Sequence, residues 1–163
     1  MTRPPATLFL TCGLPGSGKT TLARRLERDH SALRLTADEW LCDLHPELSE
    51  AERDTLRDRV ERIQWSTALG VLALGANVVL DWGLWAREER DRYRSQAQAI
   101  GARVVLCPLE PTRQKLLDRL RPRNAAPGPG VFRVTEDEFE RAWHFFQRER
   151  PTPEELALFD PMP

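Results

Sequence analysis

The residues from Thr11 to Thr21, TCGLPGSGKTT, have the types and the spacing that bind a phosphate group. Residues 13–20 match the pattern GxxxxGK[ST]. Glycines let the backbone curl so that its N–H groups point at an anion, and a following helix adds the positive end of its dipole. Lys19 is expected to reach the β- and γ-phosphates of a nucleotide, and the Thr20 hydroxyl to bind Mg²⁺. The nucleotide-binding residues predicted from this stretch are Gly13, Pro15, Gly16, Ser17, Gly18, Lys19, Thr20 and Thr21.

Two carboxylates follow predicted strands and could complete a site for phosphoryl transfer. Asp81 ends the apolar run NVVLD, where a carboxylate would hold or order the ligands of a Mg²⁺ ion. Asp38 follows the run LRLT, where a carboxylate could accept the proton of an acceptor hydroxyl. The structural alternatives are a turn cap for Asp81 and a helix first-turn charge for Asp38. We predict the functional roles because ligands of parallel sheets bind beyond the carboxyl ends of the strands.

Arginines flank a Pro- and Gly-rich segment, residues 121–130, that is predicted to be a loop. On a mobile lid of about residues 119–133, arginines could close on the transferring phosphate and neutralise the charge of the transition state. Arg119 and Arg123 are the preferred candidates, ahead of Arg121, and a solvated helix end is the alternative. The predicted catalytic residues are Lys19, Asp38, Arg119 and Arg123, of which both arginines are also predicted to contact the nucleotide.

Three of the five tryptophans lie just after the second and third predicted strands, where an acceptor would bind. Trp40, Trp82 and Trp85 could stack on a base or on another planar or sugar ring. The alternative interpretation is that these tryptophans pack beneath the helices. Together with Arg87, they form the predicted acceptor site.

A sheet of parallel strands alternating with helices has to position these residues. Five strands are predicted, at residues 6–12, 33–36, 77–81, 103–110 and 156–159. Helices are predicted at residues 20–28, 49–75, 88–100 and 112–120 and after the capping sequence TEDE at Thr135. Another capping box is predicted in TADE, with Thr36 as the N-cap and Glu39 at N3. This alternation predicts an α/β fold with right-handed crossovers.

The composition limits the class of protein further. A chain of 163 residues is typical of one domain, predicted here over residues 1–163, and its net charge of −1 argues against a general polyanion binder. The 3 cysteines have no zinc-binding or CxxC spacing, which suits a reducing compartment. The apolar run near the N-terminus is too short for a signal sequence or a membrane span. We therefore expect a soluble cytoplasmic protein without a membrane partner.

Four stretches together resemble the small bacterial P-loop kinases of the AAA type: GLPGSGKTTLARRL, LTADEW, VVLDWGLWAREERD and LDRLRPRN. That family is related to polynucleotide 5′-kinases, zeta toxins and chloramphenicol phosphotransferase, and the resemblance covers about residues 6–150. It implies a three-layer, adenylate-kinase-like P-loop fold with strand order 2-3-1-4-5, Mg²⁺-ATP as donor and a hydroxyl acceptor. It also implies that Lys19 and Thr20 form the P-loop pair, that Asp38 is the general base, and that Arg119 or Arg123 is the lid arginine.

The sequence leaves the acceptor open. Polynucleotide kinases of this group carry Asp-x-x-Arg, but Leu41 stands in the arginine position here, which weakens the nucleic acid interpretation. Arg87 or Arg90 could still supply the grip on a nucleic acid phosphate. We favour an ATP- and Mg²⁺-dependent phosphotransferase acting on the hydroxyl of a metabolite, nucleoside or antibiotic, with a polynucleotide 5′-hydroxyl kinase as the alternative. The alternative from another class is a regulatory ATPase or nucleotide switch that acts through a protein partner.

Overall fold

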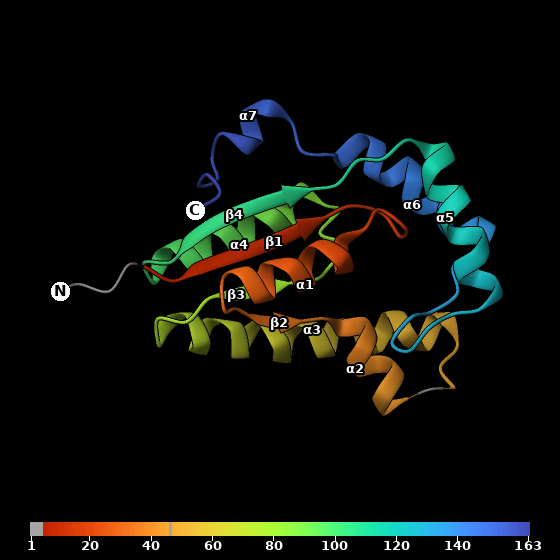
Figure 1. The fold of residues 1–163 in the computed structure, drawn as a ribbon, viewed down its shortest axis with the longest axis horizontal. Coiled ribbons are helices and arrows are strands. Elements are labelled where there is room, and N and C mark those ends of the chain that lie inside the picture. Colours follow the sequence, from red (N-terminus) through yellow and green to blue (C-terminus); the bar gives the residue numbers. More distant parts are fainter. Residues whose placement is uncertain (1–4, 46) are drawn as a thin grey trace.

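Four strands form one parallel sheet in the order β2-β3-β1-β4 (Figure 1). The computed structural model describes residues 5–45 and 47–163, so the remaining residues of the predicted domain lie outside this description. The strands are β1 (Thr7–Cys12), β2 (Leu33–Leu35), β3 (Val78–Leu80) and β4 (Arg103–Pro108). All residues of β1 and β3 are buried, as is typical of strands covered on both faces. The predicted parallel sheet and the order of its first four strands are confirmed.

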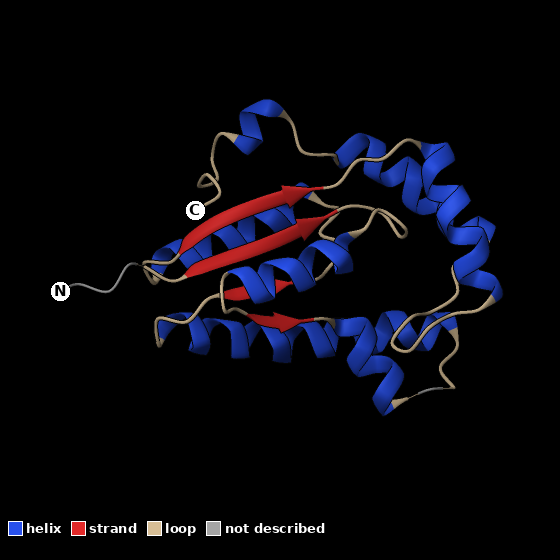
Figure 2. Ribbon diagram, in the orientation of Figure 1, coloured by secondary structure: helices blue, strands red, loops and turns tan. Residues whose placement is uncertain are grey.

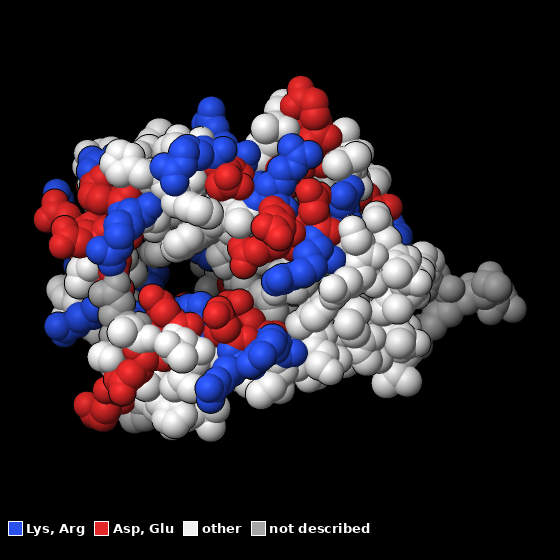
Figure 3. Space-filling view, turned by 180° about the vertical axis from the view of Figure 1, so that it is seen from behind, with Lys and Arg blue, Asp and Glu red and all other residues white. Residues whose placement is uncertain are grey.

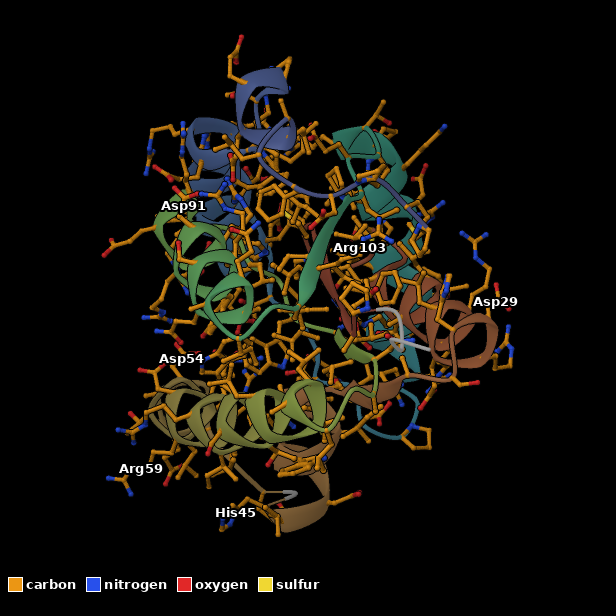
Figure 4. All side chains as sticks on the ribbon, turned by 90° about the vertical axis from the view of Figure 1, so that its left-hand side faces the viewer. Asp29, His45, Asp54, Arg59, Asp91 and Arg103 are labelled. Atoms are coloured by element: carbon orange, nitrogen blue, oxygen red, sulfur yellow. The ribbon has the colours of Figure 1, made fainter. Side chains whose placement is uncertain are left out.

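Helices cover both faces of the sheet and give three layers (Figure 2). The helices of the described residues are α1 (Lys19–Asp29), α2 (Ala37–Leu44), α3 (Glu50–Ala73), α4 (Arg87–Ala99), α5 (Arg113–Ala125), α6 (Glu136–Glu149) and α7 (Pro153–Leu156). In a view turned by 90°, α1 with Asp29 lies on one side of the sheet and α4 with Asp91 on the other (Figure 4). Within the described part of the chain, no helix combines the length and the apolar character needed to cross a membrane.

The fifth strand predicted at residues 156–159 is wrong. This segment begins in the short helix α7 and continues as a turn, in which Leu158 and Phe159 donate backbone hydrogen bonds to Glu155 and Leu156. The chain then passes the edge of β4, where Asp160 exchanges two hydrogen bonds of 2.8 Å with the backbone of Val104. The prolines at 161 and 163 have no N–H group, so a ladder of hydrogen bonds cannot continue along this edge.

The loop predicted at residues 121–130 is wrong in its first half, because α5 continues to Ala125 with Pro122 inside it. Proline removes one backbone donor from a helix. Asn124 ties the end of α5 to the next segment: its side chain donates to the carbonyl of Val134 at 2.7 Å and accepts from the N–H of Val134 at 3.0 Å. Arg119 and Arg123 therefore lie one turn apart on the same side of a helix.

The capping box predicted in TADE is also wrong. Thr36 is the N-cap of α2, but its side chain makes no capping hydrogen bond. Both carboxylate oxygens of Glu39 instead accept hydrogen bonds from Arg34, at 3.0 and 2.9 Å. The ion pair with Arg34 takes the place of the capping hydrogen bond that Glu39 was expected to make. Helix-capping rules do not include such a partner.

Candidate active site

The phosphate loop connects β1 to α1 at the carboxyl end of the sheet (Figure 1). Gly16 and Gly18 have φ values of 82° and 99°, in the left-handed region that favours glycine. Gly18 is also the N-cap of α1, and the first N–H groups of a helix have no partner within it. Of the other predicted loop residues, Gly13 is buried, Pro15 is half-buried and Thr21 is exposed in the first turn of α1. The backbone geometry is that of an anion site.

Two side chains of this loop fit a nucleotide phosphate. Lys19 is half-buried, and its ammonium group donates a hydrogen bond of 2.8 Å to the carbonyl of Leu14. Burial lowers the pKa of Lys19 to about 8, although the carboxylates of Asp81 and Asp38 act in the opposite direction. The hydroxyl of Ser17 is buried and has no hydrogen-bond partner within the described residues. An unpaired buried hydroxyl costs free energy that a phosphate oxygen would restore.

Asp81 and Thr20 offer oxygen ligands beside the loop. The Asp81 side chain is 2% exposed, and its Oδ1 accepts a hydrogen bond of 3.4 Å from the Thr20 hydroxyl. Burial raises the pKa of Asp81, opposed by Thr20, Lys19 and Arg34. In the part of the chain that the structure describes, no group of three or more His, Cys, Asp or Glu residues is arranged so that it could hold a metal ion by itself. One carboxylate and one hydroxyl fit Mg²⁺, which is usually held by one or two carboxylates together with substrate phosphates.

Arg34 holds the other side of the Asp81 carboxylate. Its Nη1 donates to Asp81 Oδ2 at 3.2 Å, while its Nη2 binds Glu39 and its Nε lies 3.4 Å from Glu27. Oδ1 of Asp81 is thereby turned toward Thr20. Sequence reasoning missed this residue, because Arg34 was read only as part of a strand. The pairing of Arg34 with Val79, two residues before Asp81, explains the contact, but this register is visible only in the structure.

Asp38 lies in the first turn of α2, and its charge acts on Lys19. Its Oδ1 accepts a hydrogen bond of 2.6 Å from Arg57 of α3, and the Asp38 side chain is 42% exposed. An accessible carboxylate can take a proton from a bound hydroxyl, and the ion pair with Arg57 fixes its direction. Arg57 was not predicted either, since nothing local in the sequence connects it with a residue 19 positions away.

The two preferred lid arginines reach different parts of the cleft. Nη1 of Arg119 donates to the carbonyls of Gly16 and Ser17, at 3.2 and 3.4 Å, and so lies over the phosphate loop. Arg123 is half-buried and donates to the carbonyl of Phe132 at 3.2 Å. Burial lowers the pKa of Arg123, and the charge of Asp38 opposes this effect. Arg121, the weaker candidate, is exposed.

The segment after α5 turns back beside α2 and α3 (Figure 1). Phe132 packs against the small core formed by Ala37, Leu41 and Val60. The guanidinium of Arg53 lies 4.6 Å from the centre of the Phe132 ring. The predicted lid segment is therefore anchored by contacts on the side of the cleft that carries Asp38.

A hollow opens in the face of the molecule shown in Figure 3, and Asp and Glu side chains gather beside it. Burial raises the pKa of Glu61, on α3, to about 7. Arg57 opposes this shift, whereas Glu89, Asp58 and Asp38 add to it. Glu61 therefore lies within electrostatic range of Asp38 and of two further carboxylates. Glu61, Glu89 and Asp58 were not among the predicted site residues.

The predicted acceptor residues do not come together. Trp40 is 37% exposed on α2, whereas Trp82 is buried, donates to Gln64 Oε1 at 2.9 Å and packs edge-on against Tyr93. Trp85 is half-buried and donates its indole N–H to the carbonyl of Gly13 at 2.9 Å. Arg87 is half-exposed at the start of α4 and pairs with Asp91. The structure thus leaves Trp40 open to a ligand and uses Trp82 and Trp85 in packing.

Arg90, considered above as a grip on nucleic acid, is not available for that role. Its side chain is fully buried and pairs with Glu155 at 2.6 Å. That expectation is wrong because a helix-face arginine reads as exposed in a sequence, whereas here the C-terminal segment covers it.

The parallel sheet, the phosphate loop and the Asp81 carboxylate define a P-loop domain with a kinase-like fold. The model of the AAA domain family matches residues 8–148, and the chain belongs to this family. The resemblance to small P-loop kinases is confirmed at this level. No curated protein matches the sequence.

Solved structures with the same fold include several that bind or transfer phosphates according to their names. A chain of the Pnkp1/Rnl/Hen1 RNA repair complex has a TM-score of 0.73 and 19% identity, over 98% of this chain and 48% of that chain. The protein thus spans about half the length of that relative. The APS kinase CysC of Mycobacterium tuberculosis has a TM-score of 0.58 and 22% identity, over 77% and 74% of the two chains. Kti12 of Chaetomium thermophilum, in complex with ADP-AlF3, has a TM-score of 0.62 and 18% identity, over 94% and 86%.

Proposed function

We propose that the protein is an ATP- and Mg²⁺-dependent phosphotransferase that moves the γ-phosphate to a hydroxyl of a small molecule. The observation that carries this proposal is the position of Asp38 at the carboxyl edge of the sheet, where Arg34 links Asp81, beside Thr20, to Glu39, the neighbour of Asp38 in the chain. This arrangement brings the phosphate loop and a half-exposed carboxylate from another element to the same cleft. A transferase needs this pairing of a donor site with a base for the acceptor, whereas nucleotide binding alone does not. We also propose that residues 1–163 form one kinase domain with residues 119–133 as its lid.

Each residue of the cleft has a role in this proposal. Lys19 and the backbone N–H groups bind the phosphates, and Arg119 and Arg123 neutralise charge on the transferring group. Thr20 and Asp81 would hold Mg²⁺, which would neutralise charge on the phosphate oxygens and so reduce their repulsion of the nucleophile. Asp38 accepts the proton of the acceptor hydroxyl, and Arg57 keeps its carboxylate in place. Catalysis then consists of positioning and charge neutralisation.

The surroundings of Asp38 favour a small molecule over a nucleic acid end. Asp38, Glu89 and Asp58 all act electrostatically on Glu61, and this acidic group would repel the phosphates of a polynucleotide. The buried state of Arg90 removes one of the two arginines that could have held a nucleic acid phosphate. Trp40, on the same helix as Asp38, remains the best placed aromatic ring for contact with an acceptor. A polynucleotide 5′-hydroxyl kinase stays the alternative, supported by the fold of the RNA repair protein.

A screen for transfer of a labelled γ-phosphate tests the proposal. The acceptors are aminoglycosides, other hydroxylated antibiotics, nucleosides, sugars, and DNA and RNA with 5′-hydroxyl ends. We expect a labelled small molecule with the wild-type chain, none with Lys19→Ala, and none with Asp38→Asn although that variant still binds ATP. Label on a nucleic acid end would support the alternative. Release of inorganic phosphate without any labelled acceptor would support a regulatory ATPase.

A further inference from the structure

The connection between β3 and α4, residues 81–86, braces the first glycine of the phosphate loop. The N–H of Gly13 donates to the carbonyl of Gly83 at 3.0 Å. The carbonyl of Gly13 accepts the indole N–H of Trp85 at 2.9 Å. Both backbone polar groups of Gly13 are thus bound to this connection, so a displacement of the connection would displace the start of the phosphate loop.

The connection adopts a conformation that needs support from outside. Leu84 has a φ of 45°, in the left-handed region that non-glycine residues rarely occupy. The packing beside it is tight, because a Cβ atom on Gly83 would lie 2.7 Å from Nε1 of Trp85. The carbonyl of Leu84 accepts hydrogen bonds from Cys12 at 3.3 Å and from Arg90 at 3.0 Å. Contacts from other elements therefore hold the backbone in place.

Arg90 of α4 provides most of these contacts. Its guanidinium group has five N–H donors, and the structure supplies five acceptors for them. Two acceptors belong to the connection, the carbonyls of Leu84 and Trp85 at 3.0 and 2.6 Å. The others are the carbonyl of Glu149 at 2.6 Å and the carboxylate oxygens of Glu155 at 2.6 and 2.9 Å. This complete matching fixes the orientation of the guanidinium group.

Glu155 brings the C-terminal segment into the same arrangement. It belongs to α7, which lies with α6 beside α4 (Figures 1 and 4), and its side chain is 1% exposed. A buried guanidinium needs a partner of opposite charge, and a two-pronged carboxylate also sets its direction. Glu155 thus turns Nη1 of Arg90 toward the carbonyls of Leu84 and Trp85.

We propose that Arg90 and Glu155 are positioning residues for the nucleotide. Through this buried pair, the C-terminal segment sets the geometry of residues 81–86 and of the phosphate loop, and so controls nucleotide affinity. The inference rests on the proposed nucleotide-binding function, but it concerns binding and not transfer. Calorimetric titration with Mg²⁺-ATP, far below the unfolding temperature, can therefore test it without an acceptor.

The decisive variant is the double substitution Arg90→Met with Glu155→Leu. Removing both charges avoids an unpaired buried ion, and such apolar replacements often keep stability. We expect the double variant to unfold near the wild-type temperature but to bind Mg²⁺-ATP with a Kd on the order of tenfold higher, because the loop is misplaced. Wild-type affinity in this folded variant would overturn the inference.

Two further variants keep the test decisive. Trp85→Phe keeps an aromatic ring but removes the indole N–H that binds Gly13, so it should raise the Kd even if the double variant does not fold; an unchanged Kd would contradict the inference. Arg94→Met is the matched control, because Arg94 lies one turn further along α4 and contacts Leu158 and Phe159 but not residues 81–86. Its Kd should equal that of the wild type. A wild-type chain that binds no nucleotide would overturn the proposed function and this inference together.

Discussion

At the scale of single residues, the two oxygens of the Asp81 carboxylate have different partners. Oδ2 accepts a hydrogen bond of 3.2 Å from the Arg34 guanidinium, and Oδ1 accepts one of 3.4 Å from the Thr20 hydroxyl. Arg34 also binds Glu39 through both carboxylate oxygens. Because Nη2 and Nε of Arg34 are held by Glu39 and Glu27, its Nη1 points at Asp81 in a fixed direction. The metal-side oxygen of Asp81 is therefore oriented before any ion binds.

Replacing Arg34 should raise the Mg²⁺ requirement of the protein. In Arg34→Ala, the Asp81 carboxylate is free to rotate, so we expect about tenfold more Mg²⁺ for half-maximal stabilisation by ATP. Thermal unfolding at fixed ATP and increasing Mg²⁺ measures this effect. Arg24→Ala is the control, because Arg24 also reaches Glu39, at 3.4 Å, but is exposed and does not contact Asp81. Equal Mg²⁺ requirements for Arg34→Ala and the wild type would contradict the assigned role.

Glu61 should make the stability of the protein depend on pH. Burial raises its pKa from 4.5 to about 7, so the folded state holds this proton more tightly than the unfolded state. The contribution of Glu61 to stability is therefore fully present below pH 4.5 and is lost as pH rises through 7. In Glu61→Gln this loss is absent, so the free energy of unfolding of the variant should be higher than that of the wild type by roughly 2 kcal/mol at pH 8. Urea unfolding at pH 5 and 8 gives the difference; a gap that does not widen with pH would refute it.

The residues of the phosphate loop, Asp38 and Asp81 could be predicted because their positions follow from local rules. A glycine pattern requires only a strand before it and a helix after it, and strand ends mark the binding edge of a parallel sheet. Arg34 and Arg57 could not be predicted, because their roles depend on the register between two strands and on the packing of α3 against α2. The packed state of Trp82 likewise depends on Gln64, a residue of α3.

At the scale of elements, the strands and long helices follow their apolar periodicity. The predictions were wrong where contacts with distant residues determine the secondary structure. The residues of the predicted fifth strand form the end of α7 and a turn, and α5 extends through Pro122 to Ala125. The hydrogen bonds between Asn124 and Val134 fix that helix end, and they join residues whose spacing carries no pattern. The path of the segment after α5 was therefore not predictable from its Pro and Gly content.

The tip of that segment provides a test of its docking on α2. Gly130 has a φ of 69°, and a Cβ atom there would lie 2.6 Å from Cγ of Glu39. We expect Gly130→Ala to destabilise the fold by about 1 kcal/mol through the left-handed backbone, and to slow phosphate transfer by shifting the tip from Glu39.

The same loop offers a matched control. A Cβ atom on Gly128 would meet no other atom within 4 Å, so Gly128→Ala should leave stability and transfer close to wild type. Urea unfolding and the transfer rate measure both effects. If the two alanine variants behave alike, the contact between Gly130 and Glu39 has no part in closing the cleft.

At the scale of the whole molecule, the distribution of charge matters more than its sum. The net charge is −1, yet Arg119 of α5 lies over the phosphate loop, whereas the carboxylates of Asp38, Glu89 and Asp58 all act on Glu61. Under the proposed function, the donor side would attract an anion and the acceptor side a cation. A balanced composition conceals this separation, because it arises only when the elements are folded against each other.

This separation predicts the ionic strength dependence of transfer. For an acceptor that carries a protonated amine, kcat/KM should fall as salt rises, since salt screens its attraction to the carboxylates around Asp38; for a neutral acceptor with the same hydroxyl, it should stay nearly constant. Steady-state rates between low and physiological salt, at saturating Mg²⁺-ATP, measure the difference. At pH 8, where Glu61 is mostly ionised, Glu61→Gln should make the salt effect smaller for the amine alone, because one carboxylate has lost its charge. If a 5′-hydroxyl oligonucleotide proved the better acceptor, with a kcat/KM that falls with salt, the acceptor side would have to be cationic toward its substrate, contrary to the charges around Asp38.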